Sequence, residues 1–182
     1  MPMDTQAIQN LRSRADAKLK YAQIHLDLLN ERGGNGGADF DRAVEESILS
    51  HLLGAKEAFL IEINAYYNCG VPTEAVTPGS LRKVFATRGV KCPELAELYE
   101  LENEPESWLA HAKQMRDHST HVAGVPRAFH IGGENDGKVF LRNPNTGAHV
   151  EVDAPKALAD WVGSMHALLE KLRASAIAAN AT

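Results

Sequence analysis

Three of the eight histidines in the chain lie within eleven residues of one another, at positions 111, 118 and 121, and Arg116 and Asp117 lie between them. A histidine near its ordinary pKa transfers protons at neutral pH, and a guanidinium group matches phosphate oxygens with two hydrogen bonds. On a helix, Asp117 would lie one turn before His121 and could orient its imidazole ring. The segment therefore contains the residue types needed for acid–base chemistry at a phosphate ester.

The helix expected over residues 108–122 has two separate faces when its residues are placed at 100° intervals. The core face consists of Trp108, Ala112, Met115, Ser119 and Val122. An adjacent polar face consists of His111, Gln114, His118 and His121. Its regular spacing is that of a contact surface, but the same spacing fits a solvated helix face that is rich in histidine.

The run Arg116-Asp117-His118-Ser119-Thr120-His121 resembles the R-x4-6-H signature of the HEPN superfamily, including the polar residue directly after the arginine. HEPN proteins are small helical bundles, many of them dimeric, and the active members are metal-independent ribonucleases. The resemblance implies that His121 acts as general acid or base on the 2′-hydroxyl or the leaving oxygen. It also implies that Arg116 stabilises the phosphorane-like charge, with support from Asp117 and His118. An RNA substrate, no cofactor and no metal follow from the same resemblance.

A homodimer is expected for two reasons. Arg116 and His121 are about 140° apart on an ideal helix, so a phosphate is more easily met by residues from two chains related by a twofold axis. The long striped helices of a small bundle also often leave apolar surface for a partner. Arg142 and His149 fit the same signature spacing, but they fall in a predicted hairpin, where the geometry of that family cannot form.

Two other functions remain open. The first is a non-catalytic dimeric bundle that binds another protein through its histidine face or its small sheet. The second is a three-histidine metal site inside the bundle, formed by His51, His166 and either His118 or His121, as in known three-histidine centres.

The composition is that of an ordinary globular protein. Of the 182 residues 44% are apolar and 24% are charged, and the 19 basic and 24 acidic residues give a net charge of −5. These values exclude disordered, collagen-like and disulfide-scaffold classes. The acidic balance gives no signal for DNA binding. Cys69 and Cys92 form no CxxC pattern, and the sequence has neither an export signal nor an apolar run that could span a membrane. We therefore expect two reduced thiols and a cytoplasmic protein.

The first half of the chain predicts a helical hairpin. Residues at gaps of three and four form one stripe of a helix over 5–32, namely Ile8, Leu11, Ala15, Leu19, Ala22, Leu26 and Leu29. A glycine run at 33–37 ends this helix. A second helix is expected over 40–67, capped by Asp39 or Asp41, with Glu45 and Glu46 on its solvated face.

In the second half of the chain, the spacing of the apolar residues changes from a helical to a strand-like period. Short helices are expected near 81–87 and 93–102, followed by the helix at 108–122, which Ser107 caps. Alternating apolar residues around two glycine-bearing turns then predict a three-stranded antiparallel meander over 127–152. Asp153 caps a last helix over 155–175, and the tail 176–182 is expected to fray. The predicted fold is a single, mainly α domain (1–182): an antiparallel bundle of four or five helices, with helices over 5–122 and 155–175 and a small β-meander before the last helix.

Overall fold

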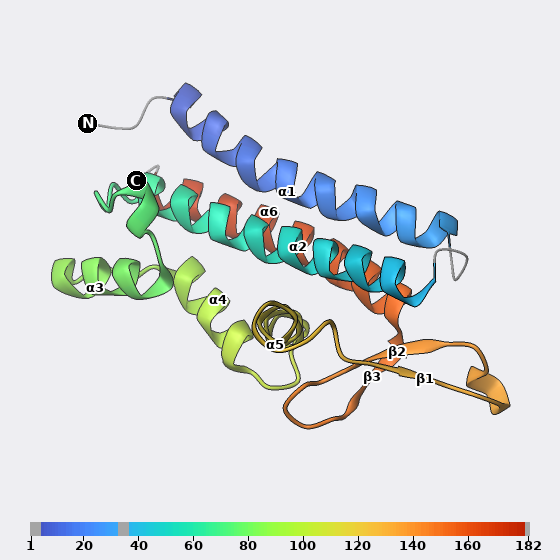
Figure 1. Ribbon diagram of the computed structural model, residues 1–182. Helices are drawn as coiled ribbons and strands as arrows, with labels where there is room; N and C mark the ends of the chain where they lie inside the picture. The colour runs from blue at the N-terminus through green and yellow to red at the C-terminus, as the bar shows by residue number, and fades with distance from the viewer. Residues whose placement is uncertain (1–4, 33–36, 181–182) are drawn as a thin grey trace.

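Three long helices form the centre of the molecule and lie side by side (Figure 1). The computed structural model describes residues 5–32 and 37–180. The long helices are α1 (Thr5–Arg32), α2 (Ala38–Tyr66) and α6 (Ala154–Asn180). The first two form the predicted hairpin, and each of the three packs against the other two. The predicted glycine turn between α1 and α2 lies, at 33–36, outside the described residues.

The predicted apolar stripes form the core. On α1, the side chains of Ala15, Leu19, Ala22, Leu26 and Leu29 are all buried. The apolar faces of α2 and α6 are buried as well, which includes Ile48, Phe59, Leu158 and Met165. Complete burial of one such large side chain is worth about 1.5–3 kcal/mol, so these stripes fix the rotation of each helix against its neighbours.

A buried network of ion pairs also joins the three long helices. Arg173 of α6 is only 2% exposed, and it donates two hydrogen bonds to Glu62 of α2, with N···O distances of 2.9 and 2.8 Å. Its Nη1 lies 2.8 Å from a carboxylate oxygen of Asp16 on α1 and 2.7 Å from one of Glu170. Both carboxylate oxygens of Glu62 therefore accept a hydrogen bond, as buried charges require.

Shorter helices cover one side of this bundle. They are α3 (Pro78–Arg88), α4 (Pro93–Asn103) and α5 (Trp108–His121), and a 3-10 turn, η1 (Thr73–Ala75), precedes them. As predicted, the Ser107 hydroxyl caps α5, since it accepts a hydrogen bond from the backbone N–H of Ala110 at 3.0 Å. No helix in the described ranges combines the length and the apolar character that crossing a bilayer requires.

A three-stranded antiparallel sheet lies between α5 and α6 in the chain, as predicted. Its strands are β1 (Arg127–Phe129), β2 (Val139–Arg142) and β3 (His149–Asp153), in the order β1-β2-β3, with a 3-10 turn, η2 (Gly133–Asn135), before β2. Ala128 pairs with Phe140, and Arg142 pairs with His149. The sheet lies at the end of the bundle where α1 ends and where α2 and α6 begin (Figure 1).

Two predicted helix ends differ from the structure. The N-cap of α2 is Gly37 and no side chain caps it, so Asp39 and Asp41 lie within its first turn, where the helix dipole favours carboxylates. The predicted cap of α6 is confirmed, because Asp153 accepts a hydrogen bond from the N–H of Lys156 at 3.1 Å. This helix does not fray after residue 175 but continues to Asn180, because the alanine-rich sequence favours helix and Ala176 is completely buried.

Candidate functional site

The four residues predicted to be catalytic lie on α5, but the charges among them are matched within the chain. Arg116 donates from Nε to Asp117 Oδ1 at 2.9 Å and from Nη1 to Glu57 Oε1 at 3.4 Å. His118 Nδ1 lies 3.1 Å from the carbonyl oxygen of Ala123, just beyond the end of the helix. The guanidinium group expected to meet a phosphate is therefore held by two carboxylates.

In the described part of the chain, these four side chains lie outside the main cavities. His121 is the last residue of α5 and is exposed to solvent. None of the main cavities formed by the described residues is lined by Arg116, Asp117, His118 or His121. Within one chain, the sequence neighbours on α5 thus remain a surface cluster.

The three-histidine metal site is not formed either. Within residues 5–32 and 37–180, no group of three or more His, Cys, Asp or Glu side chains is placed to hold a metal ion. His51 packs on α1, where its ring centroid lies 5.4 Å from that of Tyr21 and 5.3 Å from that of His25. His166 instead lines a groove between α1 and α6 that His51 does not reach.

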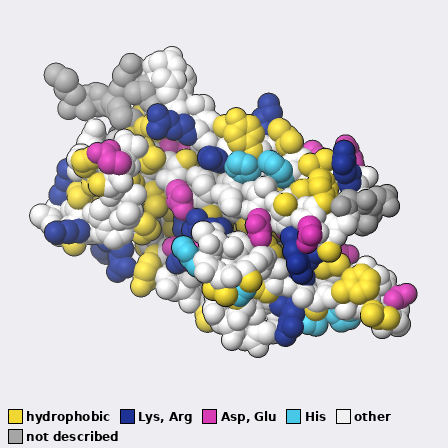
Figure 2. Space-filling view, viewed as in Figure 1, with side chains coloured by type: hydrophobic (Ala, Val, Ile, Leu, Met, Phe, Trp, Pro, Cys, Tyr) yellow, Lys and Arg dark blue, Asp and Glu magenta, His cyan; other side chains and the backbone are white. Residues whose placement is uncertain are grey.

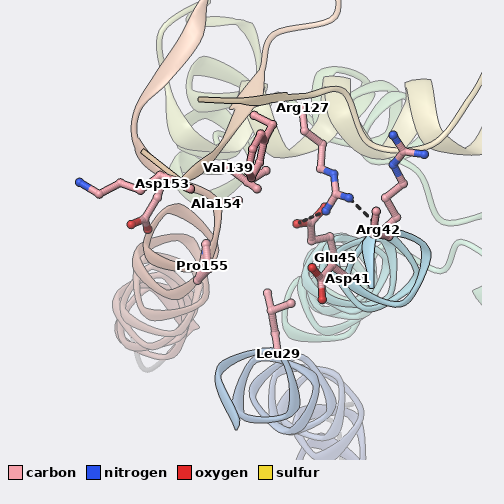
Figure 3. Close-up of a pocket in the computed structure, with 13 residues that line it drawn as sticks. Leu29, Asp41, Arg42, Glu45, Arg127, Val139, Asp153, Ala154 and Pro155 are labelled. Atoms are coloured by element: carbon pink, nitrogen blue, oxygen red, sulfur yellow. Dashed lines mark hydrogen bonds and ion pairs between the residues drawn. The ribbon is translucent and has the colours of Figure 1, made fainter. Parts of the chain in front are cut away.

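A cavity of about 600 Å³ lies where the three long helices meet the sheet (Figure 3). We call it the end cavity. The last turns of α1, the first turns of α2 and α6 and all three strands contribute to its walls. The lining residues are Leu29, Ala38, Asp41, Arg42, Glu45, Arg127, Phe129, Gly137, Lys138, Val139, Asp153, Ala154 and Pro155. Residues far apart in the sequence therefore converge on one site.

A buried ion pair crosses the end cavity from α2 to β1. The Glu45 residue is 2% exposed, and its Oε1 accepts a hydrogen bond from Arg127 Nη1 at 3.1 Å. The other terminal nitrogen of Arg127 donates to the carbonyl oxygen of Ala38 at 2.9 Å, at the uncapped start of α2. Burial raises the pKa of Glu45, and the nearby guanidinium group of Arg127 opposes that shift only in part.

Two residues that line the end cavity each have a carboxylate oxygen that is buried without a hydrogen-bond partner among the described residues. These oxygens are Oε2 of Glu45 and Oδ1 of Asp41, which lie one helical turn apart on α2. The charge of Asp41 also helps to raise the pKa of Glu45. A buried polar group left without a partner costs about 1–3 kcal/mol of folding free energy. These two atoms therefore mark a place where the sequence is not optimised for stability.

The rest of the wall of the end cavity combines apolar side chains with Arg42, Lys138 and Asp153. Leu29 rises from α1, Val139 descends from β2, and Pro155 faces them from α6 (Figure 3). Phe129 contributes an aromatic ring that is 63% exposed. Two basic groups of the cavity wall are engaged elsewhere: Arg42 lies 4.0 Å from Asp39, and Lys138 donates to Asn135 at 3.1 Å.

The sequence prediction placed Glu45 on a solvated face, and this was wrong. Glu45 precedes the buried residues Ile48 and Leu49 by three and four positions, so it lies on the buried face of α2. That spacing is the signal that could have identified it. Its partner Arg127 lies 82 residues further along the chain, and no local pattern connects the two.

The comparisons with known proteins give one match. A family model described as "Family of unknown function (DUF6586)" matches residues 9–178, which include every helix and strand described above in whole or in large part. No curated protein and no solved structure matches the chain. The end cavity lies entirely within the matched range.

Proposed function

The chain belongs to the DUF6586 family of unknown function, and we propose that it is a non-catalytic binding module whose ligand occupies the end cavity. The observation that carries this proposal is the state of Glu45, a buried carboxylate with one oxygen paired and the other unpaired. Glu62 provides an internal reference, because it is equally buried and both of its oxygens accept hydrogen bonds. Tyr66, Gln114 and His130 also carry a buried atom without a partner among the described residues, but Glu45 and Asp41 are the two such residues that line the end cavity. Incomplete pairing of this kind is typical of a functional site.

The dimensions and the lining of the cavity fit a small ligand. Its volume of about 600 Å³ lies within the range of roughly 300–1,000 Å³ that small-molecule sites occupy. Like such sites, it combines apolar walls with a few polar groups. Among the lining residues of the described chain there is no His, Cys, Ser, Thr or Tyr. Proton transfer would therefore depend on Asp41, Glu45, Asp153 or Lys138, with no imidazole or thiol beside them, which favours binding over catalysis.

A screen with a blocked variant tests the binding function. In Val139→Phe a half-buried side chain of the cavity wall becomes larger, whereas Val122→Phe enlarges a residue that is 75% exposed and outside the cavity. A library of small molecules is screened by thermal shift against both variants and the wild type. We expect compounds that raise the Tm of the wild type and of Val122→Phe but not of Val139→Phe. The proposal is wrong if no compound shows this pattern.

The ribonuclease implied by the HEPN resemblance stays a prediction. Arg116 could meet a phosphate only by leaving Glu57 and Asp117, or by sharing the phosphate with a second chain. The face shown in Figure 2 carries mixed basic and acidic side chains rather than a broad basic surface. RNA-binding proteins usually depend on such a basic surface, so the binding module is the better-supported function.

We also retain a homodimer and a cytoplasmic location as proposals. Two large apolar side chains at β1 and just after it are well exposed and support the homodimer: Phe129 at 63% and Ile131 at 86%. Light scattering coupled to size-exclusion chromatography would test it, and a monomer at micromolar concentration would contradict it. Cys69 and Cys92 are both buried as free thiols, which fits a reducing compartment.

A further inference from the structure

We infer that a second site, a groove between α1 and α2, binds a small phosphate monoester with an apolar body. The groove has a volume of about 640 Å³. Arg14 and Lys18 of α1, residues from the second half of α2 and the segment 73–78, which leads into α3, form its walls. We call it the basic groove. The sheet and α3 lie at opposite ends of the bundle (Figure 1), so this site is separate from the end cavity.

The charges that line the basic groove call for an anion. Its wall contains three basic side chains, those of Arg14, Lys18 and Lys56, and one acidic side chain, that of Glu57. The whole chain has a net charge of −5, so an excess of two positive charges at one groove runs against its composition. A negatively charged ligand would balance this excess.

The excess remains when the ion-pair partners of the wall residues are counted. Lys56 is 6% exposed and pairs with Glu102, and Lys113 lies 3.9 Å from the same carboxylate. Glu57 lies 3.4 Å from Arg116, whose second carboxylate partner is also counted. The enlarged set has five basic and three acidic side chains, so the excess is again two.

The two unmatched charges belong to Arg14 and Lys18. Neither side chain has a hydrogen-bond or ion-pair partner among the described residues. The two residues are four positions apart on α1, where like charges face each other and destabilise a helix. Burial lowers the pKa of His51 on α2, and the charge of Lys18 lowers it further, so this charge acts on its surroundings without being cancelled. A bound anion would relieve the repulsion.

The nature of the two cations favours a phosphate group. A guanidinium group binds phosphate oxygens with two parallel hydrogen bonds, and an ammonium group donates up to three. A phosphate monoester has about 1.5–2 negative charges at pH 7, which match the excess of two. The side chain of Lys18 packs on α2 at Gly54, where an added Cβ would lie 3.4 Å from its Cδ. The first residues of α3, whose dipole is positive at this end, also line the groove.

The rest of the wall calls for an apolar body. Aside from two threonines, it consists of small or apolar side chains, which include Ala58, Leu60, Ile61, Val76 and Pro78. The volume of the groove lies within the range of roughly 300–1,000 Å³ that small-molecule sites occupy. Two cations beside an aliphatic wall suit an alkyl or aryl phosphate better than a bare inorganic ion.

Four matched probes separate these requirements. Hexyl phosphate has both the charge and the apolar chain, hexanoate has a single negative charge, hexanol has none, and inorganic phosphate lacks the chain. Each is titrated into the ¹⁵N-labelled full chain, and binding is followed by NMR. We expect hexyl phosphate to bind at least tenfold more tightly than the other three and to shift the amide signals of residues 14–18, 54–61 and 73–77.

Variants of three basic residues on α1 provide the matched comparison. Arg14→Gln and Lys18→Gln each remove one unmatched charge from the groove, and we expect each to weaken hexyl phosphate binding at least fivefold. The double variant should abolish binding. Lys20→Gln removes the same charge from an exposed lysine outside the basic groove, and we expect no change. Arg14 and Lys18 are also exposed, and circular dichroism establishes that all these variants are folded.

The possible outcomes separate the basic groove from the end cavity. We expect Val139→Phe to leave hexyl phosphate binding unchanged. The inference is overturned if hexanol or hexanoate binds as tightly, if binding survives the double variant, or if Lys20→Gln weakens it equally. If Val139→Phe removes the binding, the probe occupies the end cavity, so the inference fails while the proposed function gains support. Absence of hexyl phosphate binding overturns the inference alone.

Discussion

Two arginine–carboxylate clusters in this protein have similar residues and opposite surroundings. On α5, Arg116 has a side chain that is 28% exposed, and its partners Glu57 and Asp117 are 56% and 45% exposed. In the end cavity, the side chains of Arg127 and Glu45 are 9% and 3% exposed. In the first cluster, Arg116 and Asp117 stand out in the sequence because they are neighbours. The second stands out only in the folded chain.

The difference shows that burial, rather than the spacing of reactive residue types, distinguishes the better candidate site. If the ion pairs of Arg116 break, water can form hydrogen bonds with the separated side chains. These pairs therefore contribute little to the free energy of folding. Water reaches the Arg127 pair poorly, and the unpaired oxygens of Glu45 and Asp41 beside it have a free-energy cost. A cost of that kind persists in a folded protein more readily when a ligand offsets it.

The largest expected effect comes from removing the buried arginine. Arg127→Met leaves the carboxylate of Glu45 buried without its partner, and we expect it to lower the free energy of unfolding by about 3–5 kcal/mol. Arg116→Met removes exposed pairs and should lower it by less than about 1 kcal/mol. Urea denaturation of the two variants and the wild type measures both values. Equal losses in the two variants would show that burial does not separate the clusters.

The second expected effect comes from replacing both members of the buried pair. Glu45→Leu combined with Arg127→Met removes both charges and leaves apolar side chains of similar length. We expect the double variant to match the wild type or to exceed it by about 1–4 kcal/mol in free energy of unfolding, as replaced buried ion pairs often do. It should also lose the ligand binding that Val139→Phe removes.

The same urea series, with Glu45→Leu added, completes a double-mutant cycle for this pair. Glu45→Leu alone leaves Arg127 buried without a carboxylate and should be clearly destabilising. A double variant as unstable as the sum of its single variants would indicate that the pair serves stability rather than binding. Gain in stability with loss of binding is the result that assigns the pair to a functional site.

Much of the fold could be predicted because its signals are local. The stripe from Ala15 to Leu29, the cap at Ser107 and the change of period at the meander each depend on residues within a few turns of one another. The errors at helix ends have local causes as well. Gly37 takes the N-cap position of α2 that an aspartate was expected to fill, and buried Ala176 prolongs α6.

The end cavity could not be predicted because its contacts are distant in the chain. Arg127 and Glu45 are 82 residues apart, and they meet only because the meander lies over the start of α2. Similarly, the placement of Arg116 on a helix was predicted correctly, but Glu57, which engages it, lies 59 residues earlier. Periodicity indicates which face of a helix is buried, but it does not identify the group that will lie opposite.

The pH dependence of stability gives a smaller effect that probes the same cavity. Burial raises the pKa of Glu45 above its ordinary value of 4.5, although Arg127 opposes the shift. The folded state therefore holds a proton at pH values where the unfolded chain has released it. This contribution to stability is fully present below pH 4.5 and is lost as the pH rises through the folded-state pKa.

Comparison with Glu45→Gln, which cannot ionise, isolates this contribution. We expect the stability of the wild type relative to Glu45→Gln to fall as the pH rises from 4.5, and urea denaturation at several pH values measures it. A constant difference between the two proteins, or one that grows with pH, would show that Glu45 is better compensated in the cavity than its unpaired oxygen indicates.

The smallest expected effect belongs to the α5 cluster and tests the ribonuclease prediction directly. Mixed RNA is incubated in EDTA with the wild type and with His121→Ala, and we expect the same background cleavage from both. The reason is that Arg116 would have to leave two carboxylates before it could stabilise a phosphorane, and His121 does not line any of the main cavities of the described chain. Cleavage by the wild type that the variant loses would make the α5 cluster, rather than the end cavity, the better candidate site. The matched charges on α5 would then be a resting arrangement that RNA or a second chain opens, and a metal-independent ribonuclease would replace the binding module as the function of this protein.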